Sequence, residues 1–110
     1  MKFEMNGHIW EIVEVGHKEI MEEYSKDGDM SNIASIYAFV RFSDHKLFID
    51  VNNCYYTMNR SLLHELMHIY IYEYCSWEMN FNEGIVCDLV ANSHNAIHKI
   101  ADEYWNGKIE

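Results

Sequence analysis

The chain has 110 residues, 49% hydrophobic and 15% aromatic, which suits one small folded domain over residues 1–110 and is too apolar for a disordered tail. Eight Lys and Arg stand against eighteen Asp and Glu, and the formal net charge of -10 argues against a nucleic-acid-binding protein. No apolar run reaches the roughly 18 residues of a membrane span, and the N-terminus is too polar for a signal peptide. Three cysteines without a CxxC pair suit a reducing compartment, so we expect a cytoplasmic protein.

The first part of the chain predicts a strand followed by a short helix. From His8 to Val15 apolar residues alternate on both faces, which is typical of a strand, and Asn6-Gly7 before it is a turn signal. From His17 to Tyr24 the apolar residues recur at helical spacing. The loop-forming residues at 26–29 end this helix.

The next segment predicts a β-hairpin. Ser35–Phe42 is rich in β-branched and aromatic residues, and Lys46–Val51 alternates between apolar and polar positions. Ser43–His45 between them fits a hairpin turn. These two strands and the first one form a small antiparallel sheet of about three strands.

A long helix follows, capped by Thr57 or Asn59 and running to about Cys75. It is apolar on almost all sides, so we expect it to be buried in the middle of the domain.

A second long helix is predicted from about Asn82 to Trp105, ended by Asn106-Gly107. Its inner stripe is marked by Ile85, Leu89, Ala96 and Ile100. The predicted order, β-α-β-β-α-α, is that of an α+β domain with a short N-terminal helix and two long helices.

The first long helix contains His64-Glu65-Leu66-Met67-His68, the HExxH pattern. Residues four apart share one face of a helix, so the two imidazoles can bind one ion. Glu65 lies about 100° around the helix, where it can reach a water molecule on that ion as a general base. The pattern predicts zinc ligands at His64 and His68 and a catalytic carboxylate at Glu65.

A catalytic zinc needs a third protein ligand. Glu83 is our prediction, because it lies fifteen residues after His68 and in the first turn of the second long helix, where a carboxylate is favoured. Asp88 is the first alternative, either as ligand or as a hydrogen-bond acceptor for a ligating histidine. Cys87 shares a face with Glu83 and is the second alternative.

The remaining histidines and tyrosines give weaker signals. His94 and His98 form another i, i+4 pair, but His94 is ~16 Å along the helix from Glu83, so we expect a solvated or hydrogen-bonded face. His8, His17 and His45 have no ligand spacing. Four tyrosines are candidates for stabilising an oxyanion: Tyr55, Tyr56, Tyr72 and Tyr74.

HELMH followed by the helix of Asn82–Asp88 (NEGIVCD) resembles the gluzincin peptidases, and NEGI is similar to the NEAI segment of thermolysin-like enzymes. The length and order of elements resemble the small phage and prophage proteins of the ImmA/IrrE-like metallopeptidase group. In that group the second motif usually reads Glu-x-Glu-Ala-Asn, of which this chain retains the first residue, Glu83. The resemblance implies a minimal zincin core and a zinc-dependent endopeptidase.

The resemblance also implies a regulatory protein of a mobile element as substrate, such as a transcriptional repressor. An acidic enzyme would associate with a basic DNA-binding protein faster than a neutral enzyme would. Two alternatives remain open: a non-catalytic domain that zinc stabilises, and a metal-free acidic interaction domain. The physiological metal is also open.

Overall fold

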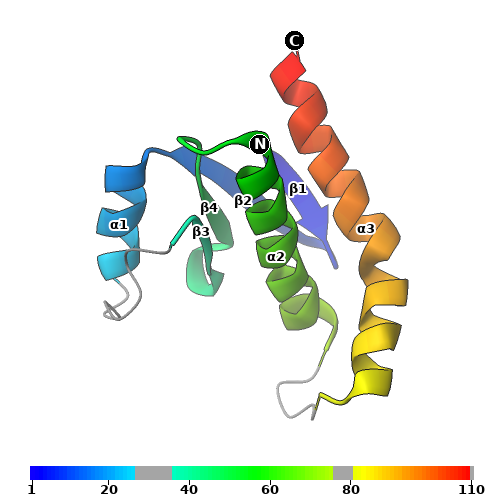
Figure 1. Cartoon of the computed structure of the whole chain (residues 1–110). Helices are drawn as coiled ribbons and strands as arrows, with labels where there is room; N and C mark the ends of the chain where they lie inside the picture. The colour runs from blue at the N-terminus through cyan, green and yellow to red at the C-terminus, as the bar shows by residue number, and fades with distance from the viewer. Residues whose placement is uncertain (27–35, 76–80, 110) are drawn as a thin grey trace.

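The computed structural model describes residues 1–26, 36–75 and 81–109. Figure 1 shows the arrangement of its helices and strands. In chain order they are β1 (Lys2–Met5), β2 (His8–Val15), α1 (His17–Ser25), β3 (Ala38–Arg41), the 3-10 turn η2 (Phe42–Asp44), β4 (Lys46–Asp50), α2 (Tyr55–Tyr74) and α3 (Glu83–Ile109). The α+β class, the short N-terminal helix and the two long helices are as the sequence predicts.

The sheet differs from the prediction in strand number and direction. It has four strands in the order β1-β2-β4-β3, and β2 pairs with β4 in parallel. The unpredicted strand β1 forms a hairpin with β2 through Asn6 and Gly7, whose φ angles are 52° and 79°. The three predicted strands are present, but the sheet has a fourth strand and is mixed, so the prediction of an antiparallel sheet is wrong. Strand β3 begins at the end of the sheet where β2 ends and runs antiparallel to β4, so the β3–β4 hairpin returns the chain parallel to β2.

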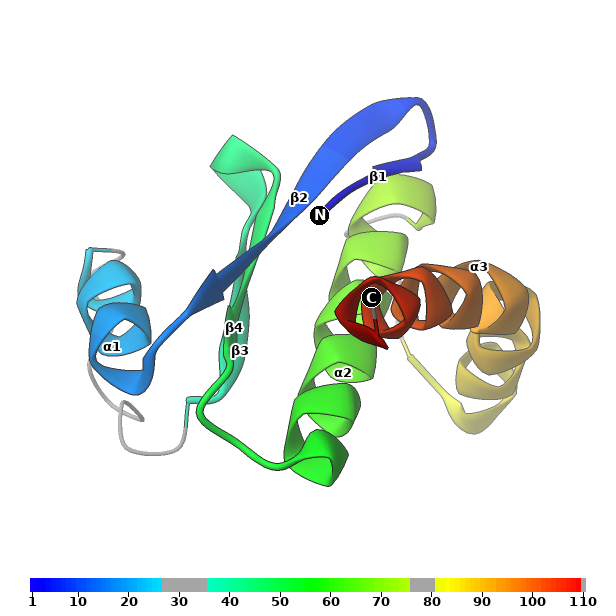
Figure 2. The ribbon, with the colours of Figure 1, turned by 90° about the horizontal axis from the view of Figure 1, so that it is seen from above.

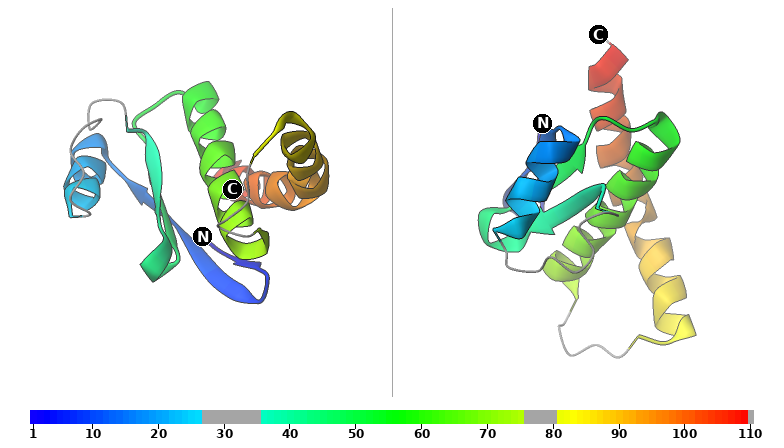
Figure 3. Two further views of the ribbon diagram at one scale, coloured as in Figure 1. Left: turned by 90° about the horizontal axis from the view of Figure 1, so that it is seen from below. Right: turned by 60° about the vertical axis from the view of Figure 1, so that its left-hand side comes forward.

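The strands and helices form three layers, with α1 on one face of the sheet and α2 and α3 on the other (Figure 2). Figure 3 shows the same layers from below and from the side. The period-two alternation of the strands divides the buried side chains between the two faces. The α2 face packs the larger core, which includes Trp10, Leu47 and Leu66. The α1 face packs a smaller one around Ile20 and Phe39.

Helix α2 has one buried and one exposed face. The buried face consists of Met58, Leu62, Leu66 and Ile69. The expectation of a helix buried on all sides is wrong, because among the described residues the sheet and α3 cover one face and leave the other exposed. The helix also begins earlier than predicted, with Cys54 at the N-cap in place of Thr57 or Asn59. Within the described ranges no helix has the length and hydropathy needed to cross a membrane.

Helix α3 begins as predicted and ends later. The side-chain oxygen of Asn82 accepts a hydrogen bond from the backbone N–H of Ile85 at 3.0 Å, which is an N-cap. The helix continues through Asn106-Gly107, and in its last turns Tyr104 and Lys108 both contact the carboxylate of Glu14. In the predicted inner stripe Ala96 is exposed, and Ile97 is buried in its place.

Two histidines outside the HExxH motif stabilise buried carboxylates. His17 Nδ1 lies 3.0 Å from Asp50 Oδ2, and His8 Nδ1 lies 2.7 Å from Glu73 Oε2. Both carboxylate side chains are 2% exposed, whereas both imidazoles are more than half exposed. Paired groups of this kind satisfy buried charges, so these histidines have structural roles in the fold.

Candidate metal centre

The exposed face of α2 brings the two histidines of the HExxH motif together. The Nε2 atoms of His64 and His68 lie 3.1 Å apart, and both side chains are exposed. Two nitrogen ligands at about 2.0–2.1 Å from a tetrahedral zinc ion are about 3.3 Å from each other. The pair therefore matches the spacing of two zinc ligands.

The surroundings of His68 also favour the form of the imidazole that binds metals. Partial desolvation and the neighbouring charge of His64 lower the pKa of His68 from its usual 6.5. A neutral imidazole has a free lone pair on one nitrogen, whereas a protonated one has none. The lowered pKa of His68 therefore favours its neutral, metal-binding form.

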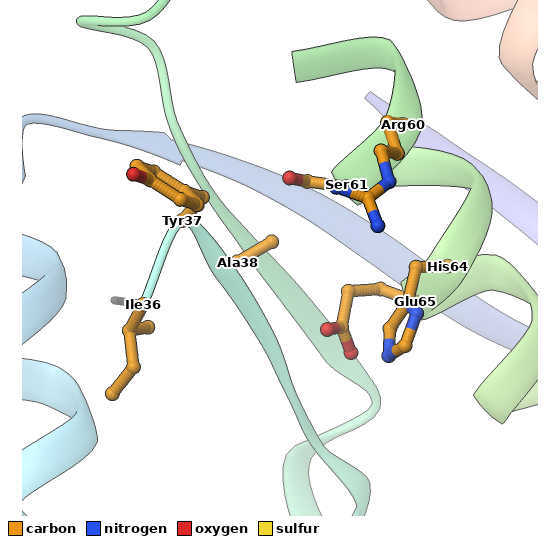
Figure 4. A pocket seen from close by; sticks show the side chains of 7 residues that line it. All are labelled: Ile36, Tyr37, Ala38, Arg60, Ser61, His64 and Glu65. Atoms are coloured by element: carbon orange, nitrogen blue, oxygen red, sulfur yellow. The ribbon is translucent and has the colours of Figure 1, made fainter. Parts of the chain in front are cut away.

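Glu65 projects from α2 into a pocket of about 340 Å³ between the helix and the start of β3 (Figure 4). The pocket is lined by Ile36, Tyr37, Ala38, Arg60, Ser61, His64 and Glu65. Desolvation of the half-buried carboxyl group raises the pKa of Glu65 from 4.5 to about 7. In the described part of the chain this carboxyl group has no hydrogen bond or ion pair. Its pKa places it where a general base operates at neutral pH.

The raised pKa predicts a pH-dependent gain in stability for Glu65→Gln in the metal-free protein. A carboxyl group with a higher pKa in the folded chain binds its proton more tightly there, so wild-type stability falls as the pH rises from about 4.5 through about 7. At pH 8 in chelator we expect the variant to be more stable than the wild type by about 1–3 kcal/mol, and at pH 4.5 to be equal. Urea unfolding at the two pH values measures this. Glu22→Gln, on the exposed side of α1, controls for the change in net charge, and an equal gain there would contradict the explanation.

The structure does not bring Glu83 to the histidine pair. Helix α3 crosses α2 at a steep angle (Figure 2), and Ser93 Oγ of α3 donates to Met67 Sδ of α2 at 3.4 Å. Glu83 precedes Ser93 by ten residues, so it lies about 15 Å from this contact along α3. Glu83 is exposed, and among residues 1–26, 36–75 and 81–109 no group of three His, Cys, Asp or Glu could hold a metal. Its role as third ligand stays a prediction.

The other candidate ligands also lie apart from the pair. Cys87 and Asp88 are exposed on α3, and Asp88 lines a separate pocket beside Tyr70 and Tyr74. His94 and His98 are both exposed, with ring centroids 4.4 Å apart, as expected for a solvated face.

Three polar residues of the pocket did not stand out in the sequence. None of the four candidate tyrosines lines it, and the tyrosine that does is Tyr37. Arg60 and Ser61 precede His64 and Glu65 by four residues, so the i, i+4 spacing extends the same two helix rows by one turn. The i, i+4 spacing from His64 and Glu65 is therefore the sequence signal that identifies Arg60 and Ser61.

The chain was compared with known proteins, and it matches no protein-family model, no curated protein and no solved structure. The resemblance to ImmA/IrrE-like metallopeptidases therefore stays a prediction, and the function is inferred from the geometry of the site.

Proposed function

We propose that the protein is a zinc-dependent hydrolase that cleaves peptide bonds, a metalloprotease with His64 and His68 as ligands and Glu65 as general base. The observation that carries this proposal is the 3.1 Å separation of the two Nε2 atoms, with Glu65 beside them in a pocket. Two imidazoles at ligand spacing and an adjacent carboxylate are the protein groups that metal-assisted hydrolysis requires.

Each side chain has a defined task in this reaction. When bound, zinc lowers the pKa of a coordinated water toward about 7 and polarises the carbonyl that is attacked. Glu65 accepts the proton of the attacking water at a carboxylate oxygen and then donates it to the leaving amine. Partial desolvation favours the first transfer, because it makes the carboxylate more basic than an exposed one.

Strand β3 offers a place for the substrate. It is the last strand of the sheet, and within the described residues no further strand pairs with it. The N–H of Asp50 donates to the carbonyl of Tyr37 at 2.9 Å, so in this antiparallel pair Tyr37 and Phe39 face β4. Ala38 and Val40 then turn their backbone groups outward. An extended peptide can pair with them beside the Glu65 pocket.

The substrate that we propose is a protein or peptide of the cytoplasm. Cys54, Cys75 and Cys87 are all free, which fits a reducing compartment. The family resemblance adds a regulatory protein of a phage or other mobile element. A basic DNA-binding repressor would also be attracted by the net charge of -10.

A non-catalytic role is the second candidate. Only two of the predicted ligands lie together in the described part of the chain, so zinc could stabilise the fold without an open catalytic position. A metal-free acidic interaction domain is the remaining alternative, and it requires that no zinc binds.

Zinc content per chain tests the site directly. We expect about one zinc per chain in protein purified without a metal-binding tag, and its loss in His64→Ala, because one imidazole alone is a weak site. His98→Ala is the matched control, since it breaks the other i, i+4 pair and should leave the zinc bound. Loss of zinc in Glu83→Ala would identify the third ligand, and unchanged zinc there would favour Asp88 or Cys87. No zinc in the wild type, even after zinc is added, would contradict the proposal.

A further inference from the structure

Arg60 is an exposed cation in the Glu65 pocket. The chain has two arginines, and Arg41 is fully engaged, donating from Nη1 to Glu23 Oε2 at 3.1 Å and from Nη2 to the Glu23 carbonyl at 2.7 Å. Arg60, by contrast, has no ion pair or hydrogen bond in the described part of the chain. Its guanidinium lies on the same side of α2 as the side chains of Ser61 and Glu65 (Figure 4).

An unpaired guanidinium here favours one chemistry. Arg60 is the only Lys or Arg among the described residues that line this pocket, in a chain with a net charge of -10. A guanidinium presents a planar fork of N–H donors that matches the two oxygens of a carboxylate. Arg60 therefore attracts a carboxylate into the pocket, whereas the rest of the acidic surface would repel that carboxylate.

The direction of β3 tells which part of a peptide would meet Arg60. The ring of Phe42 stacks on Tyr72 at 4.8 Å, whereas Ala38 shares the pocket with Ser61 and Glu65. Strand β3 and helix α2 therefore run in the same direction. A peptide that pairs antiparallel with β3 sends its C-terminal half toward the start of β3, which is the end where Arg60 lies.

The distance along the helix sets the position. Arg60 precedes His64 by four residues, a rise of about 6 Å. An extended peptide advances about 3.4 Å per residue. Arg60 thus lies about two peptide residues from the histidine pair, on the C-terminal side of the bond that would be cleaved.

We propose that Arg60 is a specificity residue that binds a carboxylate of the substrate on the C-terminal side of the scissile bond. The carboxylate belongs either to an Asp or Glu side chain about two residues beyond that bond or to the end of the peptide chain. This inference rests on the proposed peptidase function for the identity of the site.

Binding to a variant that cannot cleave tests the inference without measuring activity. The protein is Glu65→Gln loaded with zinc, and the probes are fluorescein-labelled octapeptides of Ala, Phe and Ser with Glu or Gln at each position in turn, ending in an amide or a free acid. Fluorescence anisotropy should show about five- to tenfold tighter binding for the acidic form at one position, or for the free acid. Arg60→Gln in the same background should remove the preference, and Arg60→Lys should retain part of it.

Lys18→Gln is the matched control, because it removes one positive charge from α1, on the opposite face of the sheet. It should leave the preference intact. Equal binding of all acidic and neutral peptides, or a preference that survives Arg60→Gln, would overturn the inference.

Hydrolysis of the same peptides by the zinc-loaded wild type separates this inference from the proposed function. Cleavage two residues before the preferred Glu supports an acidic side chain as the source, and cleavage only of free-acid peptides supports the chain end. Peptides that bind through Arg60 and are never cleaved would contradict the peptidase and retain the carboxylate site. Cleavage without any acidic preference would support the peptidase and contradict the carboxylate site.

Discussion

Replacing Glu65 by Gln is expected to lower kcat/KM for peptide hydrolysis by a factor on the order of 10²–10⁴ while zinc stays bound. The amide has almost the volume of the carboxylate and keeps the pocket filled, but it cannot accept a proton from water. His64 and His68 are unchanged, so the two Nε2 atoms remain 3.1 Å apart. Measuring kcat/KM and zinc content on the same preparations tests both halves of this prediction.

The loss in Glu65→Gln has to be separated from a general effect of charge. Glu22→Gln removes the same charge from an exposed position of α1 and should keep the wild-type kcat/KM. Wild-type activity in Glu65→Gln would mean that another group takes the proton. Loss of zinc together with activity would point to a structural role for the carboxylate.

Replacing Trp10 by Ala is expected to lower the free energy of unfolding by about 3–5 kcal/mol. The side chain is 0% exposed, stacks on His45 at 4.4 Å, and contacts the ring edges of Phe42 and Tyr72. Its Nε1 also donates to Glu73 Oε1 at 3.2 Å. Truncation leaves a cavity under α2 and removes one donor from a buried carboxylate.

Urea unfolding of two Trp10 variants separates the cavity from the hydrogen bond. Trp10→Phe retains most of the apolar volume and loses only the N–H, so we expect a loss of about 1–2 kcal/mol. A loss below about 1 kcal/mol in Trp10→Ala would contradict the role of this ring as the centre of the larger core.

The strands and helices were predictable where local alternation or periodicity is strong. Strand β2 occupies His8–Val15 and α1 begins at His17, both as the sequence indicates. Strand β1 has only four residues, of which Lys2 and Glu4 point to solvent, so its apolar pattern is too short to recognise. The parallel pairing of β2 and β4 was not predictable either, because periodicity identifies a strand without identifying its neighbours.

The site was predictable where it lies within one helix. Four-residue spacing alone places His64 and His68 together, and the structure has them so. Whether Glu83 lies near them depends on where α3 packs against α2, and the contact of Ser93 with Met67 is part of that packing. The number of residues between two motifs gives the length of the connection and does not give the position at which the helices pack. The pocket also depends on the packing of β3 beside α2, and no local sequence pattern predicts that packing.

The short outer edge of the sheet also bears on what the protein could act upon. Strand β3 has four residues, and only Ala38 and Val40 turn their backbone groups outward. A segment that is already part of a helix or sheet has its own N–H and C=O groups engaged and has none to offer this edge. A partner would therefore have to open locally before it could bind, and the free energy of that opening would be subtracted from its affinity. Susceptibility to this proposed peptidase would then follow the local stability of the partner, and loosely folded linkers would be cut before domains.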